Sequence, residues 1–299
     1  MQHLEKCPIC GTPGPAQFTS AKDWLVTGSH FNILRCRSCM FTFTQDYPDE
    51  SESGRYYESA EYISHTDSKR TFIEKIYQVA RNYMLGRKVR LVSSVTGKKH
   101  GSLLDIGSGT GHFLNSMKLA GWEVTGIEIS DNARSYSVSK FSLTVLKPTE
   151  FEKIASGSID CITLWHVAEH LHDLDGYFSD IKRVLKTGGV IIIALPNSES
   201  YDAFYYGSDW AAWDVPRHLW HFNPASFRIF AKNKGLRLIK ISPLPLDVFY
   251  IAILSERNRG KRFPSVKGII KGFLFYVHCI FRREFSSSLV YILKREGDQ

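Results

Sequence analysis

One stretch of twelve residues constrains the fold more than any other part of the chain. Residues 103–114 read LLDIGSGTGHFL, an apolar run of β type that breaks into three glycines and continues as an amphipathic pattern. Glycine suits a tight strand-to-helix turn because it adopts positive φ and leaves bare backbone for a ligand. The N–H groups of the following helix would face that ligand. The stretch therefore predicts a strand, a ligand-binding glycine turn and a helix.

The residues around the turn narrow the kind of ligand. A glycine turn alone is also typical of dinucleotide-binding folds. Here Asp105 lies inside the strand, and Gly107, Gly109 and Gly111 follow it with D-x-G-x-G-x-G spacing. The next predicted strand ends on Glu128, about 20 residues after the turn, where an acidic side chain can bind both hydroxyls of a ribose.

With these residues the chain resembles class I S-adenosylmethionine-dependent methyltransferases. The resemblance continues through SIDCITLWHVAEHL, VLKTGGVIIIALPN and PRHLWHFNPASF, over residues 100–245 and a last strand at 288–295. It implies an α/β, Rossmann-like sheet of seven strands, mostly parallel with the last strand antiparallel. It also implies S-adenosyl-L-methionine as the methyl donor, with adenine near Ile129. The implied donor-binding residues are Asp105, Gly107, Gly109, Gly111, Glu128 and Ile129.

Near the N-terminus, two C-x2-C pairs stand 25 residues apart: Cys7 with Cys10, and Cys36 with Cys39. Two such turns can complete a tetrahedral Zn²⁺ site, and so short a segment has too small an apolar core to fold without a metal. The alternative is a pair of redox dithiols, but those sit at a helix start in a βαβ unit, which is not predicted here. Four protein ligands leave no open position on zinc, so we expect a structural site.

The chain is expected to divide into a zinc ribbon (1–45), a cap with a helical connector (46–99) and a methyltransferase domain (100–299). The domain carries an insert at about 255–285. The pattern at 56–65 resembles the cap found in zinc-ribbon members of this group. Apolar residues recur at helical spacing in the connector and predict a buried stripe. They are Phe72, Ile76, Val79 and Tyr83.

A second polar cluster, Trp165 to His170, follows the strand predicted at 159–164. The carboxyl ends of strands in open α/β sheets border the ligand crevice, so this cluster should lie beside the donor. In ubiquinone-biosynthesis O-methyltransferases the matching run is E-x-x-E-H and coordinates a divalent metal. Glu169 and His170 match it, and His166 replaces the first glutamate. The resemblance thus implies a second metal at Glu169 and His170; the alternative is that both brace the following helix.

Methyl transfer to a hydroxyl needs a base, and histidine has a fitting pKa. The candidates are His166 first, then His218 and His170. His218 lies in an aromatic stretch, 198–222, that resembles the substrate-side insert of this methyltransferase group. Other residues of this stretch are possible substrate contacts: Tyr205, Trp210, Trp213, Arg217 and His221.

The net charge of +8 is concentrated in residues 255–285, which contain eight basic and two acidic residues. Lys267, Lys271, His278 and Arg282 share one face of a helix predicted within 264–283, with apolar residues around the rest. This pattern predicts an interfacial helix drawn to anionic lipid. The alternative is a helix packed on the core with its lysines in solvent, where Gly268 and Gly272 allow close approach.

The chain has no apolar window long enough for a membrane span and no secretory leader, and its cysteines do not form a disulfide framework. We therefore expect a cytoplasmic protein, peripheral to the inner face of the membrane through residues 264–283.

The favoured function is methyl transfer to a hydroxyl of a sugar, a quinone-like molecule or a lipid-linked intermediate. The first alternative is an RNA methyltransferase that binds nucleic acid through the ribbon. No basic stripe joins residues 7–39 to the pocket, and no N-P-P-Y or D-P-P-Y motif is present, so nucleic acid is an unlikely partner. The second alternative, a non-catalytic adaptor, has no physical need for the glycine turn or Glu128.

Overall fold

The computed structural model describes residues 1–57 and 72–298. For residues 72–77 it describes the backbone but not the side chains. Its largest feature is a seven-stranded sheet. In sheet order the strands are β10 (Leu236–Pro243), β11 (Ser288–Arg295), β8 (Leu185–Pro196), β7 (Ile159–Trp165), β4 (Ser102–Ile106), β5 (Glu123–Ile127) and β6 (Thr144–Leu146). Strands β8, β7, β4, β5 and β6 are parallel neighbours, and β11 runs antiparallel to both β8 and β10. The predicted fold class is confirmed.

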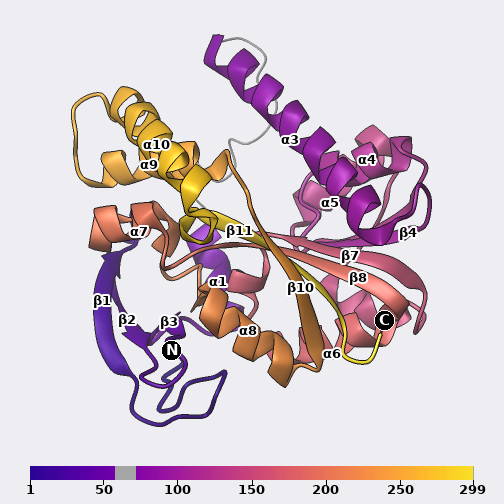
Figure 1. Cartoon of the computed structure of the whole chain (residues 1–299), viewed down its shortest axis with the longest axis horizontal. Coiled ribbons are helices and arrows are strands. Elements are labelled where there is room, and N and C mark those ends of the chain that lie inside the picture. Colours follow the sequence, from indigo (N-terminus) through magenta and orange to yellow (C-terminus); the bar gives the residue numbers. More distant parts are fainter. Residues whose placement is uncertain (58–71, 299) are drawn as a thin grey trace.

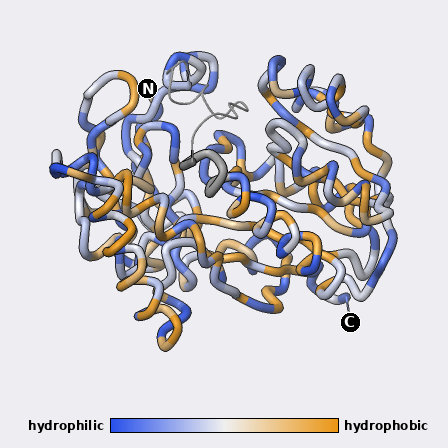
Figure 2. The backbone as a smooth tube through the Cα atoms, turned by 90° about the horizontal axis from the view of Figure 1, so that it is seen from above, coloured by the Kyte–Doolittle hydropathy of each residue, from blue (hydrophilic) through white to orange (hydrophobic). Residues whose placement is uncertain are grey.

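Helices cover both faces of this sheet, as Figure 1 shows. One face carries α3 (Phe72–Thr96), α4 (His112–Leu119) and α5 (Asp131–Phe141); the other carries α6 (Leu174–Val184) and α8 (Pro224–Asn233). The central strands are therefore apolar on both sides, as in buried parallel sheets. Ile191 packs in the core on the α6 and α8 side, whereas Ile192 packs with α4 on the other. Figure 2 shows these hydrophobic segments running through the middle of the molecule.

The connector forms one helix, α3, but its predicted buried stripe is wrong in the part that can be tested. Val79 is 70% exposed and Tyr83 is 51% exposed, whereas Val92 is fully buried. The first half of α3 extends beyond the sheet, and only its second half packs against α4 and the strands (Figure 1). The side chains of Phe72 and Ile76, and most of the cap pattern at 56–65, lie outside the described residues.

A second sheet contains the N-terminal strands β1 (Ala16–Lys22), β2 (His30–Arg35) and β3 (Thr42–Thr44). Its fourth strand, β9 (Trp220–His221), comes from the aromatic stretch after β8 and pairs antiparallel with β3. Phe41 packs on Phe222 at a ring-centroid distance of 4.9 Å. The N-terminal segment is thus joined to the methyltransferase domain by both strand pairing and apolar contact, and its folding as a separate unit stays a prediction.

The insert between β10 and β11 is a pair of helices, α9 (Asp247–Asn258) and α10 (Pro264–Phe281). It begins earlier than the predicted residue 255. A Cβ on Gly268 would lie 2.4 Å from the Cα of Ile253, and one on Gly272 would lie 2.9 Å from Phe249. The later glycine of α10 faces the earlier residue of α9, so the two helices are antiparallel. They touch through these glycines.

Short elements complete the chain. They are α1 (Glu50–Ser53), α7 (Tyr201–Tyr206) and the 3₁₀ turns Gly54–Tyr57, Pro148–Lys153, Ala168–His170, Gly207–Asp209, Ala211–Trp213 and Arg283–Phe285. No helix within the described part of the chain is long and apolar enough to cross a bilayer.

The helix pair gives a test of the packing. Gly268→Ala places a methyl group into the backbone of α9 and should lower the free energy of unfolding by about 1–3 kcal/mol, the usual cost of overpacking. The matched control is Gly86→Ala in α3, where a Cβ would meet nothing within 4 Å. There alanine should be neutral or stabilise by up to ~1 kcal/mol, because it favours helix over glycine. Urea unfolding compares the two, and equal effects would contradict the packing.

Candidate active site

The glycine turn between β4 and α4 has the predicted conformation. Gly107, Gly109 and Gly111 have φ of +71°, +52° and +77°, which side-chain-bearing residues rarely adopt. A Cβ on Gly107 would collide with Val167, and one on Gly111 would lie 2.7 Å from Leu143. A Cβ on Gly109 would meet nothing within 4 Å. The outer two glycines thus pack the turn against the protein, and the middle one faces open space.

Glu128 follows β5 directly and is held against this turn. One carboxylate oxygen accepts the Gly109 N–H at 2.7 Å and the other accepts the Ser130 N–H at 2.9 Å. Arg134 donates to the Glu128 backbone oxygen, which fixes the residue further. A carboxylate has about four lone-pair sites, so two remain for other donors. Ile129, beside it, is 76% exposed. The structure therefore brings Gly109, Glu128 and Ile129 together.

Asp105 lies in the central strand β4, two residues before the glycine turn. It is buried and accepts a hydrogen bond from the Thr163 hydroxyl at 2.6 Å. Burial raises the pKa of Asp105 to about 7, although the nearby Lys88 ammonium opposes the shift. Lys88 comes from α3 and lies 4.1 Å over the Trp165 ring. Its place beside Asp105 was not foreseen from the sequence.

His166 leaves β7 in a left-handed conformation, with φ of +57°. Its Nε2 lies 2.8 Å from Asp247 at the start of α9, and its Nδ1 lies 3.3 Å from Glu169. Burial alone would lower the pKa of His166, but these two carboxylates raise it to about 10. The imidazole is therefore protonated at neutral pH with both N–H groups directed at carboxylates. This arrangement disfavours His166, the first candidate base.

Glu169, His170 and His218 form a second cluster, with one ligand-type atom of each within 4.8 Å of the others. Glu169 is fully buried, and beyond its ion pair with His166 its oxygens accept no hydrogen bond from the described residues. His170 Nδ1 lies 3.0 Å from the Arg217 carbonyl, and His218 Nδ1 lies 2.9 Å from the Ala212 carbonyl. An Nδ1 beside a carbonyl must carry a proton, so a neutral His170 keeps its lone pair on Nε2. His218 Nε2 lies 3.8 Å from Asp214.

The electrostatics of this cluster keep His170 neutral. Burial and the neighbouring His218 lower the pKa of His170 to about 4. The two rings meet edge to face with centroids 4.5 Å apart, and the Tyr57 hydroxyl lies 3.1 Å from His170 Nδ1. The cluster thus offers one carboxylate and two imidazole nitrogens to a single point.

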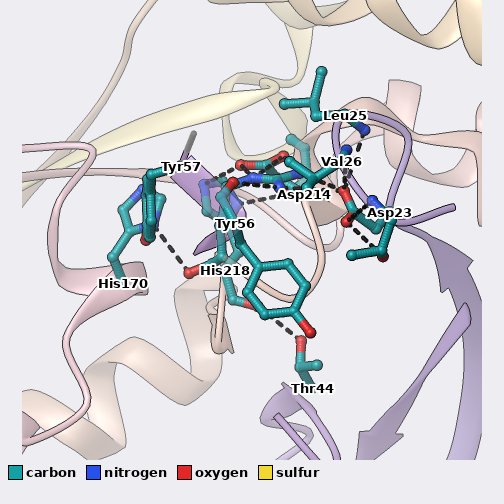
Figure 3. A network of polar contacts seen from close by, with 12 residues as sticks. Asp23, Leu25, Val26, Thr44, Tyr56, Tyr57, His170, Asp214 and His218 are labelled. Carbon is teal, nitrogen blue, oxygen red and sulfur yellow. Dashed lines mark hydrogen bonds and ion pairs between the residues drawn. The ribbon is translucent and has the colours of Figure 1, made fainter. Parts of the chain in front are cut away.

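Figure 3 shows Asp23, Tyr56 and Asp214 close to His170 and His218. Arg217 is enclosed by the first three of these residues. It is 3% exposed, and its guanidinium contacts Asp214 at 2.7 Å, Asp23 at 3.1 Å and the Tyr56 carbonyl at 3.0 Å. Trp210, Trp213 and His221, also expected as substrate contacts, are buried too. Tyr205 is partly exposed, but it lies on α7 against α10. Only His218 of the aromatic stretch joins the polar cluster.

The four N-terminal cysteines come together as the C-x2-C spacing predicts. All four Sγ atoms lie within 4.8 Å of one another, and the Cys7–Cys39 and Cys10–Cys36 distances are both 3.5 Å. Zinc–thiolate bonds of 2.3 Å place tetrahedral sulfurs about 3.8 Å apart. The cluster is compatible with a zinc ribbon.

A strand, glycine turn and helix beside an acidic residue on the next strand, within this sheet order, define a methyltransferase of α/β type. Residues 77–241 match the family described as "Methyltransferase domain". The match spans more than half of the chain, which therefore belongs to this family and is an S-adenosylmethionine-dependent methyltransferase.

Individual relatives agree with the class. The chain is 26% identical to a ubiquinone biosynthesis O-methyltransferase of Cupriavidus pinatubonensis over 53% of this chain and 69% of that protein. It is 27% identical to the protein of that name from Pelagibacter ubique, over 58% and 76%. The fold resembles magnesium protoporphyrin IX methyltransferase from Synechocystis with bound SAH, with a TM-score of 0.54 at 13% identity, over 83% and 100% of the chains. These names do not favour the RNA alternative.

The His166 arrangement predicts a pH dependence. Because its folded-state pKa is raised, the ion pairs of His166 stabilise the fold fully below about pH 6.5, and this contribution is lost as pH rises towards about 10. Histidine ring NMR signals of the wild type should show His166 protonated at pH 8. Asp247→Asn should lower its pKa, whereas Asp175→Asn on the exposed start of α6 should not. Titration of wild-type His166 near pH 6.5 would contradict the arrangement.

Proposed function

We propose that this methyltransferase transfers the donor's methyl group to a hydroxyl of a small, quinone-like acceptor. The observation that carries the proposal is the cluster of Glu169, His170 and His218. Two of its members follow Val167, which packs on the glycine turn, and the cluster offers one carboxylate and two imidazole nitrogens. Such groups suit the deprotonation of a hydroxyl. Two relatives named ubiquinone biosynthesis O-methyltransferases support the quinone-like acceptor over a sugar.

The donor is proposed to bind at the glycine turn. The bare backbone at Gly109 would contact its methionine part, and the free lone pairs of Glu128 would accept both ribose hydroxyls. Adenine would lie over Ile129, whose exposed side chain offers an apolar surface. Asp105 is proposed to act indirectly, by fixing the end of β4 through Thr163.

The chemical step is an in-line displacement in which the protein mainly positions donor and acceptor. Of the three candidate histidines, we propose His218 as the base, because the environments of the other two disfavour them. His166 is protonated, and the pKa of His170 near 4 makes it a weak base. The acceptor proton would pass to His218 Nε2.

The same cluster fits a divalent metal. Among the described residues, only His166 contacts the buried oxygens of Glu169 as a polar partner, and both histidines donate Nδ1–H to backbone carbonyls, as metal-binding histidines do. A bound cation would polarise the acceptor hydroxyl. His218 then takes the place of the first glutamate in E-x-x-E-H, because His166 is paired with Asp247. With a metal present, His218 would be a ligand, and the cation would lower the hydroxyl pKa instead.

Calorimetric titration of Mn²⁺ into zinc-loaded protein tests the metal site. Wild type should bind one ion, and Glu169→Gln should weaken binding by about 10- to 100-fold or more, because a charged ligand is lost. Glu152→Gln, on an exposed residue, is the matched control. Wild type without measurable binding would leave His218 as the base and remove the metal.

Cys7, Cys10, Cys36 and Cys39 are proposed to hold a structural zinc ion. Metal analysis should find one zinc per chain in the wild type and in Cys279→Ser, which removes a thiol outside the cluster. Cys36→Ser should lose the ion and unfold at a lower temperature, because metal binding supplies folding free energy to so small a segment. Retained zinc in Cys36→Ser would rule out the four-cysteine site.

Titration of S-adenosylhomocysteine tests the donor site. Glu128→Ala should weaken binding by about 1–3 kcal/mol, the scale of lost charged hydrogen bonds. Glu123→Ala, at the exposed start of the same strand, should bind like the wild type. Equal affinities of both variants would place the donor elsewhere.

The proposed setting is the cytoplasm, with peripheral contact to the inner face of the membrane through residues 264–283.

A further inference from the structure

The helix pair α9–α10 presents an apolar face that no described residue covers. It projects away from the seven-stranded sheet in Figure 1. Among the residues of α10, only Gly268, Gly272 and Phe275 are buried. Eight large apolar side chains on and just before this helix are more than half exposed. They are Phe263, Val266, Ile269, Ile270, Phe273, Leu274, Ile280 and Phe281.

A basic pocket adjoins this face. It has a volume of about 380 Å³ and lies between α7, α9, the loop after α9 and α10. Its lining residues are Tyr205, Glu256, Arg259, Lys261, Lys267, Ile270 and Lys271. Ile270 belongs to both the pocket and the apolar face, so the two surfaces are continuous.

The protein offsets only part of the positive charge of the pocket. Glu256, its one acidic residue, is 3% exposed and accepts a hydrogen bond from the Tyr206 hydroxyl. Within the described side chains, Lys261 and Lys267 have no ion pair with a carboxylate. Lys271 lies 4.6 Å over the Tyr205 ring, which positions its ammonium.

Arg259 completes the wall of the pocket. It donates to the Tyr205 carbonyl at 2.6 Å and lies 4.8 Å over the same ring, with Asp209 at 3.6 Å. The pocket is therefore lined by four cationic side chains and by one carboxylate, that of Glu256, which is largely buried. Such a space favours an anion with several acceptor oxygens, and phosphate fits this description.

We propose that this pocket binds the phosphate of an anionic membrane lipid while the apolar face of α10 lies among the acyl chains. The inference deepens the membrane contact in the proposed function by naming the headgroup site. A cationic pocket beside an apolar surface matches the two parts of a phospholipid, whereas a free anion would not need the apolar face. Nucleic acid would likewise leave that face exposed to water.

The geometry also links the membrane to the active site. α9 begins at Asp247, which pairs with His166, and ends beside the pocket at Arg259. Twelve helical residues span about 18 Å. A docked hairpin would thus hold the catalytic cluster close to the bilayer, where an apolar acceptor resides.

Sedimentation with vesicles tests the proposal on the full, zinc-loaded chain. Wild type should bind phosphatidylcholine vesicles that contain phosphatidylglycerol and not vesicles of phosphatidylcholine alone. Lys267→Ala/Lys271→Ala should bind the anionic vesicles about 30-fold more weakly, as expected for two basic residues near a charged surface. Lys99→Ala/Lys232→Ala, on exposed residues elsewhere, should bind like the wild type. Phe273→Ser/Phe281→Ser should also lose binding.

Titration of S-adenosylhomocysteine into every variant separates this proposal from the proposed function, since unchanged affinity shows an intact donor site. The proposal is overturned by wild type that ignores anionic vesicles, or by equal losses in both lysine pairs. It is also overturned if inorganic phosphate binds the pocket while vesicles do not. A wild-type dimer in ultracentrifugation that Phe273→Ser/Phe281→Ser dissociates would assign the apolar face to a second copy of the chain instead.

Discussion

The buried guanidinium of Arg217 joins the N-terminal segment to the loop between β8 and β9. It contacts Asp214 beside it in the chain, Asp23 after β1 and the carbonyl of Tyr56. A charge this deeply buried is tolerated only with its partners in place, and removing one partner of such a pair typically costs about 3–5 kcal/mol. The N-terminal segment is therefore held against the loop that carries His218. The N-terminal segment thus supports the loop on which the proposed acceptor side depends.

The proposed donor and acceptor sides are formed in different ways. On the donor side, local sequence suffices: a glycine turn and one carboxylate, fixed by the backbone N–H groups of Gly109 and Ser130. On the acceptor side, residues distant in sequence meet after folding, and each controls the proton state of the next. Asp247 keeps His166 charged, His166 pairs with Glu169, and Glu169 lies beside His170 and His218. In this set of contacts the pKa of His166 is raised and the pKa of His170 is lowered.

This division explains what the sequence could predict. The glycine turn, Glu128 beside it and the four-cysteine cluster follow from local patterns and spacing, and the seven-stranded sheet follows from the resemblance to class I methyltransferases. The sequence could not reveal that Asp247 pairs with His166 and raises its pKa, since 81 positions separate the two residues. Nor did it show that Arg217, Trp210 and Trp213 are structural, because buried ion pairs and substrate contacts use the same residue types. The exposed Val79 and Tyr83 show the limit of periodicity, which marks a helical face but not what lies against it.

The most direct measurement is a crystal structure with S-adenosylhomocysteine and Mn²⁺ bound to the zinc-loaded protein. The ligand's ribose hydroxyls should donate to Glu128, its amino-acid part should lie along Gly109, and its sulfur should face the cluster of Glu169, His170 and His218. A ligand that leaves Glu128 without ribose contacts, or directs its sulfur away from this cluster, would contradict the assignment of donor and acceptor sides.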